Sequence, residues 1–359
     1  MTTIAAKTRK SPLSITSVDV ARAAGVSQSV VSRAFSLHPS VADATREKIF
    51  AVANRLGYRR NLLARSLITR RSNLFALVTG ALTSTLHLQF VESLTRIAQQ
   101  RSHRVLLFAT PPDRSLDESL DSVLQYRPAG ILAMAGTPSP KMVRICQRSG
   151  VPVILLGRNS DRHAAPSVSC DNEGEAAAIA RLLLEARHRR FAFVSSQNPA
   201  MSFSLGRERG FSAAVTAALG EPPVIENGGS SYAGGYAAGQ RLLSRRRRPD
   251  AIFCSSDTMA LGLMDAARRE FGLQVPRDLS VIGFDDVPMA AWASYELTTV
   301  RQRVDTMIET AADILLGEKQ PGRRAIASFV PGDLVVRTSA RLPPRIMKGA
   351  EAPEGRGRV

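Results

Sequence analysis

Cysteine and histidine are scarce in this chain, and their scarcity argues against several kinds of site. The 359 residues include three cysteines, Cys146, Cys170 and Cys254, and five histidines. The cysteines lie in or beside apolar stretches, and neither residue type has the spacing of a metal or redox site. We therefore expect no metal and no cofactor, and we expect reduced core cysteines in a cytoplasmic protein.

Long apolar runs and catalytic motifs are also missing. Residues 1–14 lack the apolar run of a signal peptide, and no later apolar stretch is long enough to cross a bilayer. There is no Gly-x-Ser-x-Gly segment, and Gly228-Gly229 and Gly234-Gly235 do not follow a strong strand as a phosphate-binding loop would. The sequence therefore predicts neither an enzyme nor an exported or membrane protein.

Positive charge is what the chain has in excess, with a net charge of +17. Residues 1–72 hold 13 Lys and Arg against 3 Asp and Glu, a net charge of +10 on the first fifth of the chain. A basic N-terminal segment of this kind favours a polyanionic partner such as nucleic acid. The later run Arg245–Arg248 is more typical of a solvated helix end before Pro249 than of a second nucleic-acid site.

Residues 16–35 predict two short helices joined by a tight turn. Thr16 is a typical N-cap, Gly25 tolerates the backbone conformation that ends a helix, and Ser27 begins the second helix. The residues expected on the inward faces are Val18, Val20, Ala21, Val30, Val31 and Ala34. This pattern is a helix-turn-helix, whose second helix would present to the major groove of DNA the side chains of Gln28, Ser29, Ser32, Arg33 and Ser36.

Two further segments complete an all-α headpiece. Asp43 is expected to cap a third helix that ends at Gly57. The segment 61–71 mixes leucines with arginines and is too short and too weakly packed to be a stable helix by itself. It is either a helix that folds on a partner or a plain linker whose leucines cover the next domain.

From Thr16 to Ser72 the chain resembles the headpiece of the LacI/GalR family of bacterial transcription regulators. The matching stretches are VARAAGVSQSVVSRAF, VADATREKIFAVANRLGYRRN and LLARSL, and a looser likeness continues to about Ala340. The resemblance implies a repressor that binds palindromic operator DNA as a homodimer. It also implies a hinge helix that folds on DNA, with Leu67 as the wedge between minor-groove base steps.

The resemblance and the helix faces together predict the DNA contacts. Gln28 and Ser29 are expected to read base edges, while Arg33 can contact either bases or phosphates. The residues expected to hold phosphates are Thr16, Ser27, Ser32, Thr45, Tyr58 and Asn61. Ser36, Ala64 and Leu67 complete the predicted DNA-binding set.

From Asn73 onward, short apolar runs alternate with helical periodicity, which is typical of parallel α/β sheets. The first series is Leu74–Val78, Phe90–Arg101, Val105–Phe108, Leu116–Tyr126, Gly130–Met134, Pro140–Arg148 and Val153–Leu156. The second is Ala176–Glu185, Phe191–Val194, Gly206–Leu219, Tyr232–Leu243, Ala251–Cys254, Met259–Arg269 and Ser280–Gly283. Thr298–Val304 and a helix at Asp305–Leu316 are expected to return to the first lobe, and Phe329–Val336 to the second.

The expected fold is an all-α helix-turn-helix headpiece followed by an α/β, two-lobed sensor domain like that of periplasmic binding proteins. The expected segments are a flexible basic arm at 1–14, the DNA-binding domain at 15–60, a hinge at 61–72, an effector-binding domain at 73–340 and a disordered tail at 341–359. The first lobe would comprise about 73–171 and 300–328, and the second about 172–299 and 329–340.

Ligands of open α/β sheets bind at the carboxyl ends of strands, so polar residues that follow strands are the candidates. The residues that meet this condition are His87 in the loop after the first strand, Arg158, Arg207, Ser256 and Asp285. All but Arg158 also match the family pattern. Arg207 and Asp285 can each hold two vicinal hydroxyls, which suits a sugar, a polyol or a related polar metabolite.

Structural roles are the alternatives for these residues. Arg207 could be a surface helix charge, and Asp285 could cap a turn before Pro288. Asp171 and Asp257 directly precede predicted helices and are expected to be caps instead of ligand-binding groups.

The chain departs from the family pattern at two positions. Arg187-His188 stands where the family has Gly-His, which concerns a turn. Gly157 stands where a lactose-type repressor has a carboxylate, which argues against a galactoside effector. The alternative function is an exported or cytosolic sugar-binding protein without a DNA role, which would not carry a basic headpiece.

Overall fold

The computed structural model describes residues 15–36, 39–59, 72–82, 84–111, 113–158, 165–196, 202–318 and 327–346. The chain forms two compact units, Met1–Arg70 and Arg71–Val359. The predicted basic arm and the hinge residues Asn61, Ala64 and Leu67 lie outside the described residues.

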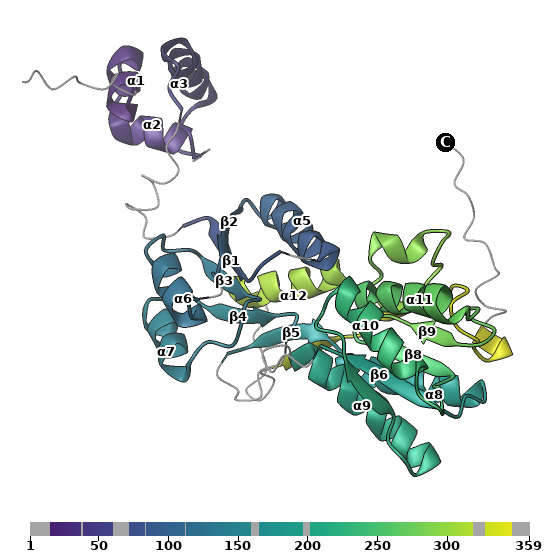
Figure 1. The fold of residues 1–359 in the computed structure, drawn as a ribbon. Helices are drawn as coiled ribbons and strands as arrows, with labels where there is room; N and C mark the ends of the chain where they lie inside the picture. Colours follow the sequence, from purple (N-terminus) through teal and green to yellow (C-terminus); the bar gives the residue numbers. More distant parts are fainter. Residues whose placement is uncertain are drawn as a thin grey trace, which may run out of the picture. The chain divides into compact units, whose positions relative to one another are not determined.

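The smaller unit contains the predicted helix-turn-helix. Its helices are α1 (Ser17–Ala24), α2 (Gln28–Ala34) and α3 (Asp43–Leu56) (Figure 1). Thr16 caps α1, because its hydroxyl accepts from the Asp19 amide at 3.4 Å and donates to the Asp19 carboxylate at 2.7 Å. Gly25 and Gly57 end α1 and α3 in the left-handed conformation, with φ of 67° and 69°.

Two details of the headpiece differ from the prediction. Val18 is 45% exposed, because it lies off the stripe of Val20, Ala21 and Ala24 that packs into the core. Asp43 is the first residue of α3 and not its cap, a position that Ala42 occupies without a side-chain hydrogen bond. A carboxylate in the first turn still stabilises the positive end of the helix dipole.

The first lobe of the larger unit is a parallel sheet with the strand order β11-β5-β4-β3-β1-β2. Its elements are β1 (Leu74–Thr79), α5 (Thr85–Gln100), β2 (Arg104–Ala109), α6 (Leu116–Leu124), β3 (Gly130–Ala133), α7 (Pro140–Arg148), β4 (Val153–Leu156), β5 (Ser167–Cys170), α12 (Val304–Leu316) and β11 (Ala327–Val330). Alternate residues of β1 pack on opposite sides: Leu77 contacts the core under α5 and α12, and Val78 the core under α6 and α7. Helices therefore cover both faces (Figure 1).

The second lobe is a parallel sheet with the order β7-β6-β8-β9. Its elements are α8 (Asn172–Glu185), β6 (Phe191–Ser195), α9 (Ser202–Leu219), β7 (Val224–Asn227), α10 (Tyr232–Leu243), β8 (Ala251–Cys254), α11 (Asp257–Phe271), β9 (Ser280–Ile282) and the short helix η1 (Pro288–Ala291). One face packs on α8 and α9 through Phe193, and the other on α10 and α11 through Val194. The predicted fold class, a headpiece plus a doubly wound two-lobed domain, is confirmed.

The C-terminal connections differ from the prediction. Phe329 and Val330 were expected in the second lobe, but they belong to β11, which pairs with β5 in the first sheet. The chain then crosses back, and β12 (Asp333–Val335) pairs antiparallel with β10 (Thr299–Arg301). A single apolar stretch, Phe329–Val336, therefore divides between two sheets, because Pro331 and Gly332 separate its halves.

Two strands and the start of the tail were not anticipated. β5 alternates serine with apolar residues and β7 reads VIEN, so neither shows the continuous apolar run expected of a buried strand. Residues 341–346 of the predicted disordered tail pack on the second lobe, where Leu342 is buried and Arg345 pairs with Glu185 at 2.5 Å.

The cysteines are core residues. Cys146, Cys170 and Cys254 are free thiols and buried, and burial raises the pKa of Cys146 to about 11 and that of Cys170 to about 12. These thiols are therefore protonated at neutral pH and unreactive. In the part of the chain that the structure describes, no helix is both long and apolar enough to span a bilayer.

Candidate functional site

The second headpiece helix presents a polar face to solvent. The predicted contact residues on and beside α2 are all exposed: Ser27, Gln28, Ser29, Ser32, Arg33 and Ser36. The Gln28 amide donates to the Ser17 hydroxyl at 3.0 Å, and the Arg33 Nε donates to the Ser29 carbonyl at 3.3 Å. These bonds hold long side chains against the helix surface, so they are partly ordered before any partner binds.

Aromatic packing fixes the opposite side of α2. Phe35 lies with its ring centroid 5.0 Å from Phe50 of α3 and 5.6 Å from Tyr58. Tyr58 and Thr45 are half-buried, and Thr16 is exposed at the start of α1. The small core thus packs α2 against both α1 and α3, which fixes the position of the helix.

A cavity of about 320 Å³ lies between the two lobes of the larger unit. Its lining comes from the carboxyl ends of strands in both sheets, including Thr79 at the end of β1, Gly157 after β4 and Ser255 after β8. The lining contains every predicted ligand-binding residue: His87, Arg158, Arg207, Ser256 and Asp285. Segments nearly 200 residues apart in the sequence, from His87 to Asp285, therefore meet at one site.

Arg207 and Asp285 form the charged centre of this cavity. Their side chains are 2% and 11% exposed, and Arg207 Nη2 lies 3.4 Å from Asp285 Oδ1. The same carboxylate oxygen accepts from Gln302 Nε2 at 2.8 Å. Burial raises the pKa of Asp285, and Arg207 opposes that rise because its positive charge favours the carboxylate.

Arg207 is held by more than this ion pair. Its Nε donates to Asn172 Oδ1 at 2.8 Å, and Nη1 donates to the Ser255 carbonyl. The guanidinium lies 3.5 Å from the centroid of the Phe284 ring, a cation–π contact. The alternative reading of Arg207 as a surface helix charge is therefore wrong.

The backbone of Asp285 adopts a conformation that few residues accept. Its φ is 119°, and its amide donates to the Val300 carbonyl at 2.8 Å. A non-glycine residue with φ in this range stores backbone strain, and such strain gathers at functional sites. The Asp285 carboxylate thus lines the cavity from a backbone conformation that costs conformational energy.

The other predicted residues reach the cavity from positions that differ in part from expectation. His87 lies in the first turn of α5 and not in the loop after β1, because Ser84 caps that helix. Burial lowers the pKa of His87, so its ring is neutral at neutral pH. The ring nitrogen Nδ1 has no hydrogen-bond partner among the described residues. Ser256 is the N-cap of α11 and makes no capping bond, and Arg158 is 6% exposed.

Sequence reasoning missed several members of the site. Gln302 bonds Asp285 and lines the cavity, and its position directly after β10 was a usable signal. Asn172, which orients Arg207, follows the unpredicted strand β5. Phe90 and Phe203 supply apolar walls, but aromatic side chains in helices look like ordinary core residues.

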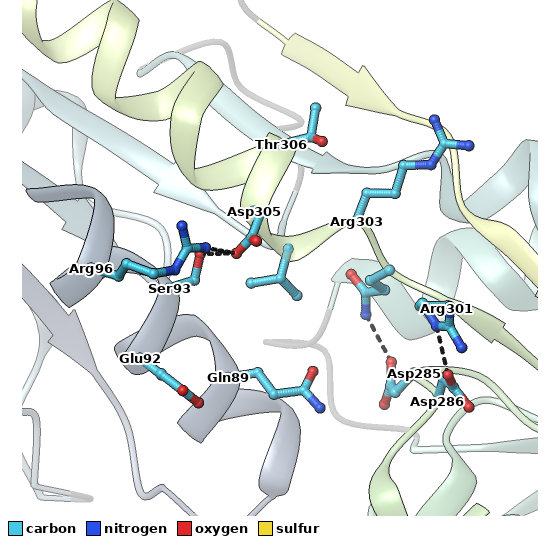
Figure 2. Close-up of a pocket in the computed structure, with 12 residues that line it drawn as sticks. Gln89, Glu92, Ser93, Arg96, Asp285, Asp286, Arg301, Arg303, Asp305 and Thr306 are labelled. Atoms are coloured by element: carbon cyan, nitrogen blue, oxygen red, sulfur yellow. Dashed lines mark hydrogen bonds and ion pairs between the residues drawn. The ribbon is translucent and has the colours of Figure 1, made fainter. Parts of the chain in front are cut away.

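A second, more open pocket of about 650 Å³ shares Asp285 and Gln302 with the first. Its charged side chains mostly face one another: Arg96 pairs with Asp305 at 2.6 Å, and Arg301 with Asp286 at 2.7 Å (Figure 2). Asp286 also accepts from Arg337 at 2.7 Å, and it is absent from the lining of the smaller cavity. Asp285 therefore lines both pockets, whereas Asp286 lines the second and is absent from the first.

Asp171 and Asp257 have structural roles of different kinds. Asp171 caps α8 as predicted, accepting from the Gly174 amide at 3.0 Å. Asp257 was also expected to cap, but it is the first residue of α11, after the N-cap Ser256, and is fully buried. It accepts from the Thr299 hydroxyl at 2.6 Å and from the Val287 amide at 2.9 Å, so it joins α11 to β10 and to the segment after Asp285.

Burial raises the pKa of Asp257 to about 7, which predicts a pH-dependent stability. The folded protein holds a proton that the unfolded chain, with a carboxyl pKa of about 3.9, releases. The contribution of protonated Asp257 to the free energy of unfolding is therefore full below about pH 4 and is lost as the pH rises through about 7. Its upper limit is about 4 kcal/mol. Urea unfolding of wild type and Asp257→Asn across this range measures it, and an equal pH dependence in both proteins would contradict it.

Comparisons with known proteins match segments of both units of the chain. The sequence model of bacterial regulatory proteins of the lacI family matches residues 16–61, and that of the periplasmic binding protein-like domain matches 180–340. Catabolite control protein A of Priestia megaterium is 30% identical, with 81% of this chain and 88% of that protein covered. The transcriptional regulator MalR of Streptomyces coelicolor is 31% identical, with 95% and 98% covered.

A solved structure adds a likeness in three dimensions. The lac repressor dimer, bound to operator and the anti-inducer ONPF, superposes with a TM-score of 0.78 at 27% identity, with 90% of this chain and 98% of that chain covered. Both units of the present chain thus have counterparts in one protein.

Proposed function

This chain belongs to the LacI family of bacterial regulatory proteins, and we propose that it is a repressor whose operator affinity is set by a small polar metabolite. A member of this family is a DNA-binding transcriptional regulator with a ligand-binding domain, not an enzyme. The observation that carries the proposal is the cavity that gathers His87, Arg158, Arg207, Ser256 and Asp285 from both lobes.

We propose a sugar, a polyol or a related metabolite as the effector. The pair Arg207–Asp285 offers donors and acceptors to vicinal hydroxyls, and Gln302 and Ser256 add polar groups to the same wall. Phe90 and Phe203 offer apolar surface to the carbon face of a ring. The alternative of a sugar-binding protein without a DNA role does not account for the headpiece.

On DNA, the proposal is a homodimer on a palindromic operator, in the cytoplasm where bacterial DNA lies. The family likeness to a dimer bound to operator supports it. One short helix contacts too few bases to be specific, and a two-fold axis doubles the contacts. Residues Asn61, Ala64 and Leu67, outside the described part of the chain, keep their predicted roles in the hinge.

Replacing Gln28 by alanine is expected to change which DNA sequence the protein prefers. Gln28 is exposed on α2, and its amide can pair with a base edge, a contact worth about 1–3 kcal/mol of discrimination. The measurement is selection from a pool of random duplexes with wild type and Gln28→Ala, followed by sequencing. We expect a two-fold symmetric motif for wild type and a relaxed position in each half-site for the variant.

Ser32→Ala is the matched control, because Ser32 lies on the same helix but is expected to hold a phosphate. This variant should weaken binding to all duplexes alike and keep the wild-type motif. If Gln28→Ala selects the same motif as wild type, Gln28 does not read base edges. No enrichment by wild type, or one chain per duplex, would contradict the operator proposal itself.

A further inference from the structure

Two arginine-rich segments, distant in the sequence, lie side by side at one edge of the second sheet. Residues 186–190 read ARHRR and precede β6, while residues 244–250 read SRRRRPD and precede β8. β6 and β8 are neighbouring parallel strands, with Phe191 opposite Ala251. The two segments therefore meet at the amino ends of the strands, the edge opposite to the one that lines the effector cavity.

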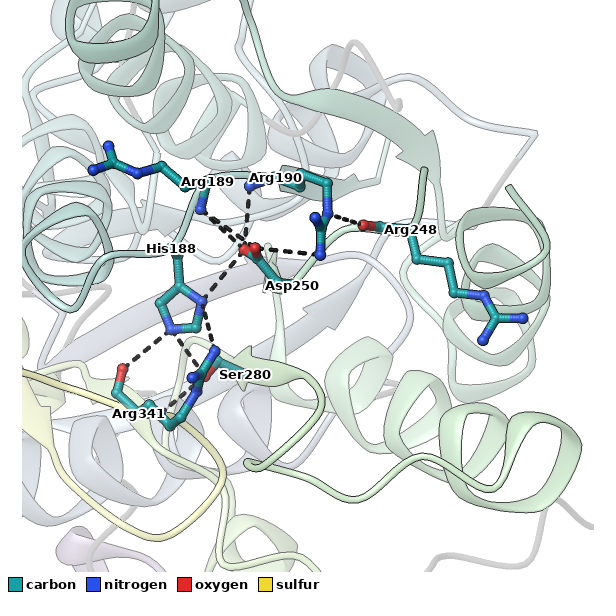
Figure 3. Close-up of polar contacts among 7 residues, drawn as sticks. All are labelled: His188, Arg189, Arg190, Arg248, Asp250, Ser280 and Arg341. Atoms are coloured by element: carbon teal, nitrogen blue, oxygen red, sulfur yellow. Dashed lines mark hydrogen bonds and ion pairs between the residues drawn. The ribbon is translucent and has the colours of Figure 1, made fainter. Parts of the chain in front are cut away.

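Specific contacts hold these segments together. Arg190 Nε donates to the Arg248 carbonyl at 2.6 Å. The Asp250 carboxylate accepts from the backbone amides of Arg189 and Arg190, both at 3.2 Å, and lies 3.4 Å from the ring of buried His188 (Figure 3). The single carboxylate of the two segments thus contacts the backbone, His188 and, of the seven arginine side chains, that of Arg190.

The guanidinium groups, by contrast, are on the surface. The seven arginines of the two segments are all exposed: Arg187, Arg189, Arg190, Arg245, Arg246, Arg247 and Arg248. Arg190 pairs with Asp250 at 3.6 Å and Arg245 with Glu226 at 3.5 Å, while the other five make no ion pair with a described carboxylate. In Figure 3 the side chains of Arg189 and Arg248 extend away from Asp250 in opposite directions.

Concentrating like charge in this way does not stabilise the fold. The guanidinium groups repel one another over a Debye length of about 8 Å at physiological salt. Arg187 adds strain, because it occupies a left-handed backbone position with φ of 66°, which glycine would accept without cost. The arrangement lowers stability and raises the positive potential at one edge of the lobe, which is what a polyanion-binding surface requires.

We propose that this arginine surface, residues 187–190 and 245–248, binds the phosphate backbone of a second DNA duplex, without sequence preference, while the headpiece holds the operator. Neither segment contains an exposed large hydrophobic side chain, and the aromatic ring beside them, Phe271, is half-buried with the Arg248 guanidinium 5.4 Å from its centroid. The surface therefore lacks the aromatic platform that single-stranded bases need and the apolar anchors of a protein or membrane contact. Exposed guanidinium groups and phosphate oxygens are complementary by themselves.

The test is a capture experiment with the full-length protein. The selected operator duplex is immobilised and saturated with protein, and a labelled duplex of random sequence is added at several salt concentrations. The test variant is R187Q/R189Q/R246Q/R247Q, whose four arginines are exposed and make no described ion pair. We expect wild type to capture the second duplex. The variant should bind this duplex at least about tenfold more weakly, and the slope of log affinity against log salt should be shallower by about 3 to 4, because four phosphate contacts are lost.

Two further variants and one further measurement, the operator affinity, decide the interpretation. R114Q/R127Q/R144Q/R148Q removes the same charge from exposed positions of the first lobe and should capture like wild type. R187K/R189K/R246K/R247K keeps the charge and should retain most of the capture. Operator affinity should be unchanged throughout, which separates failure of this proposal from failure of the headpiece.

No capture by wild type, equal capture by R187Q/R189Q/R246Q/R247Q, or an equal loss in the first-lobe control would overturn the proposal. Stronger arginine-dependent binding to phosphatidylglycerol vesicles than to the duplex at the same salt would overturn it as well, since the surface would then belong to a membrane.

Discussion

Replacement of Asp285 by asparagine should abolish the response of the repressor to its effector while operator binding persists. The change keeps the shape of the side chain and its bond to Gln302, but it removes the charge that Arg207 and the ligand hydroxyls contact. Control of operator affinity depends on a difference in ligand affinity between two conformations, typically about 1–3 kcal/mol, or roughly 5- to 150-fold. We expect the operator affinity of Asp285→Asn to be the same with and without the effector.

The measurement starts from a thermal-shift screen of sugars, polyols, sugar acids and purines. A compound that binds the folded state raises the melting temperature, because it adds RT ln(1 + [L]/Kd) to the free energy of unfolding. A compound that stabilises wild type is then added to the operator complexes of wild type and Asp285→Asn, and the operator affinity is measured with and without it.

Asp286→Asn is the control that the structure offers for this experiment. Asp286 is the neighbouring residue and is buried to a similar degree, but it bonds Arg301 and Arg337 and does not line the effector cavity. This variant should keep the response. A compound that stabilises wild type and Asp285→Asn equally and changes the operator affinity of both would place the effector elsewhere.

Replacement of Arg207 by methionine should lower the free energy of unfolding by about 3–5 kcal/mol. Arg207 is 1% exposed, and its removal leaves the Asp285 carboxylate without its positive partner in the interior. It also removes the bonds that join α9 to Asn172 and to the Ser255 carbonyl. The double variant R207M/D285N should recover part of the loss, because it removes both charges of the pair.

Arg209 gives a matched comparison in the same helix. It pairs with Glu173 at 3.4 Å, but both side chains are more than half exposed, at 58% and 60%. Surface pairs contribute at most about 1 kcal/mol, so Arg209→Met should have a small effect. Trp292, the one tryptophan, lies in the second lobe and reports its unfolding in urea by fluorescence. Equal losses for both variants would mean that the buried contacts of Arg207 stabilise the fold no more than a surface ion pair does.

The headpiece shows what local sequence can determine. The contacts that define α1 and its turn lie within a few residues: Thr16 with Asp19, and Gly25 at the C-cap. Such short-range rules are readable from spacing alone. The sequence pattern misplaced Val18, because the helix buries the stripe of Val20, Ala21 and Ala24 and Val18 lies off that stripe.

The lobes show where local rules stop. Buried parallel strands with apolar runs, such as β4 and β8, were found at their observed bounds. β5 and β7 carry serine or glutamate, and only pairing with a neighbouring strand makes them strands. The same holds for β11 and β12, which the sequence presents as one stretch and the tertiary structure divides between two sheets.

The sequence by itself determined the family, through its motifs, and it determined the helix-turn-helix and five polar residues of the cavity, because helix caps and strand ends have local signals. The tertiary structure decided that Arg207 is a buried cation stacked on Phe284, that Asp285 and not Asp286 lines the cavity of His87 and Arg207, and that Gln302 lines it as well. It also brought Arg187–Arg190 beside Arg245–Arg248, which turned a run of charge into a surface. These features rest on strand order and on crossovers between lobes, and the free energy that selects them comes from contacts between residues far apart in the chain.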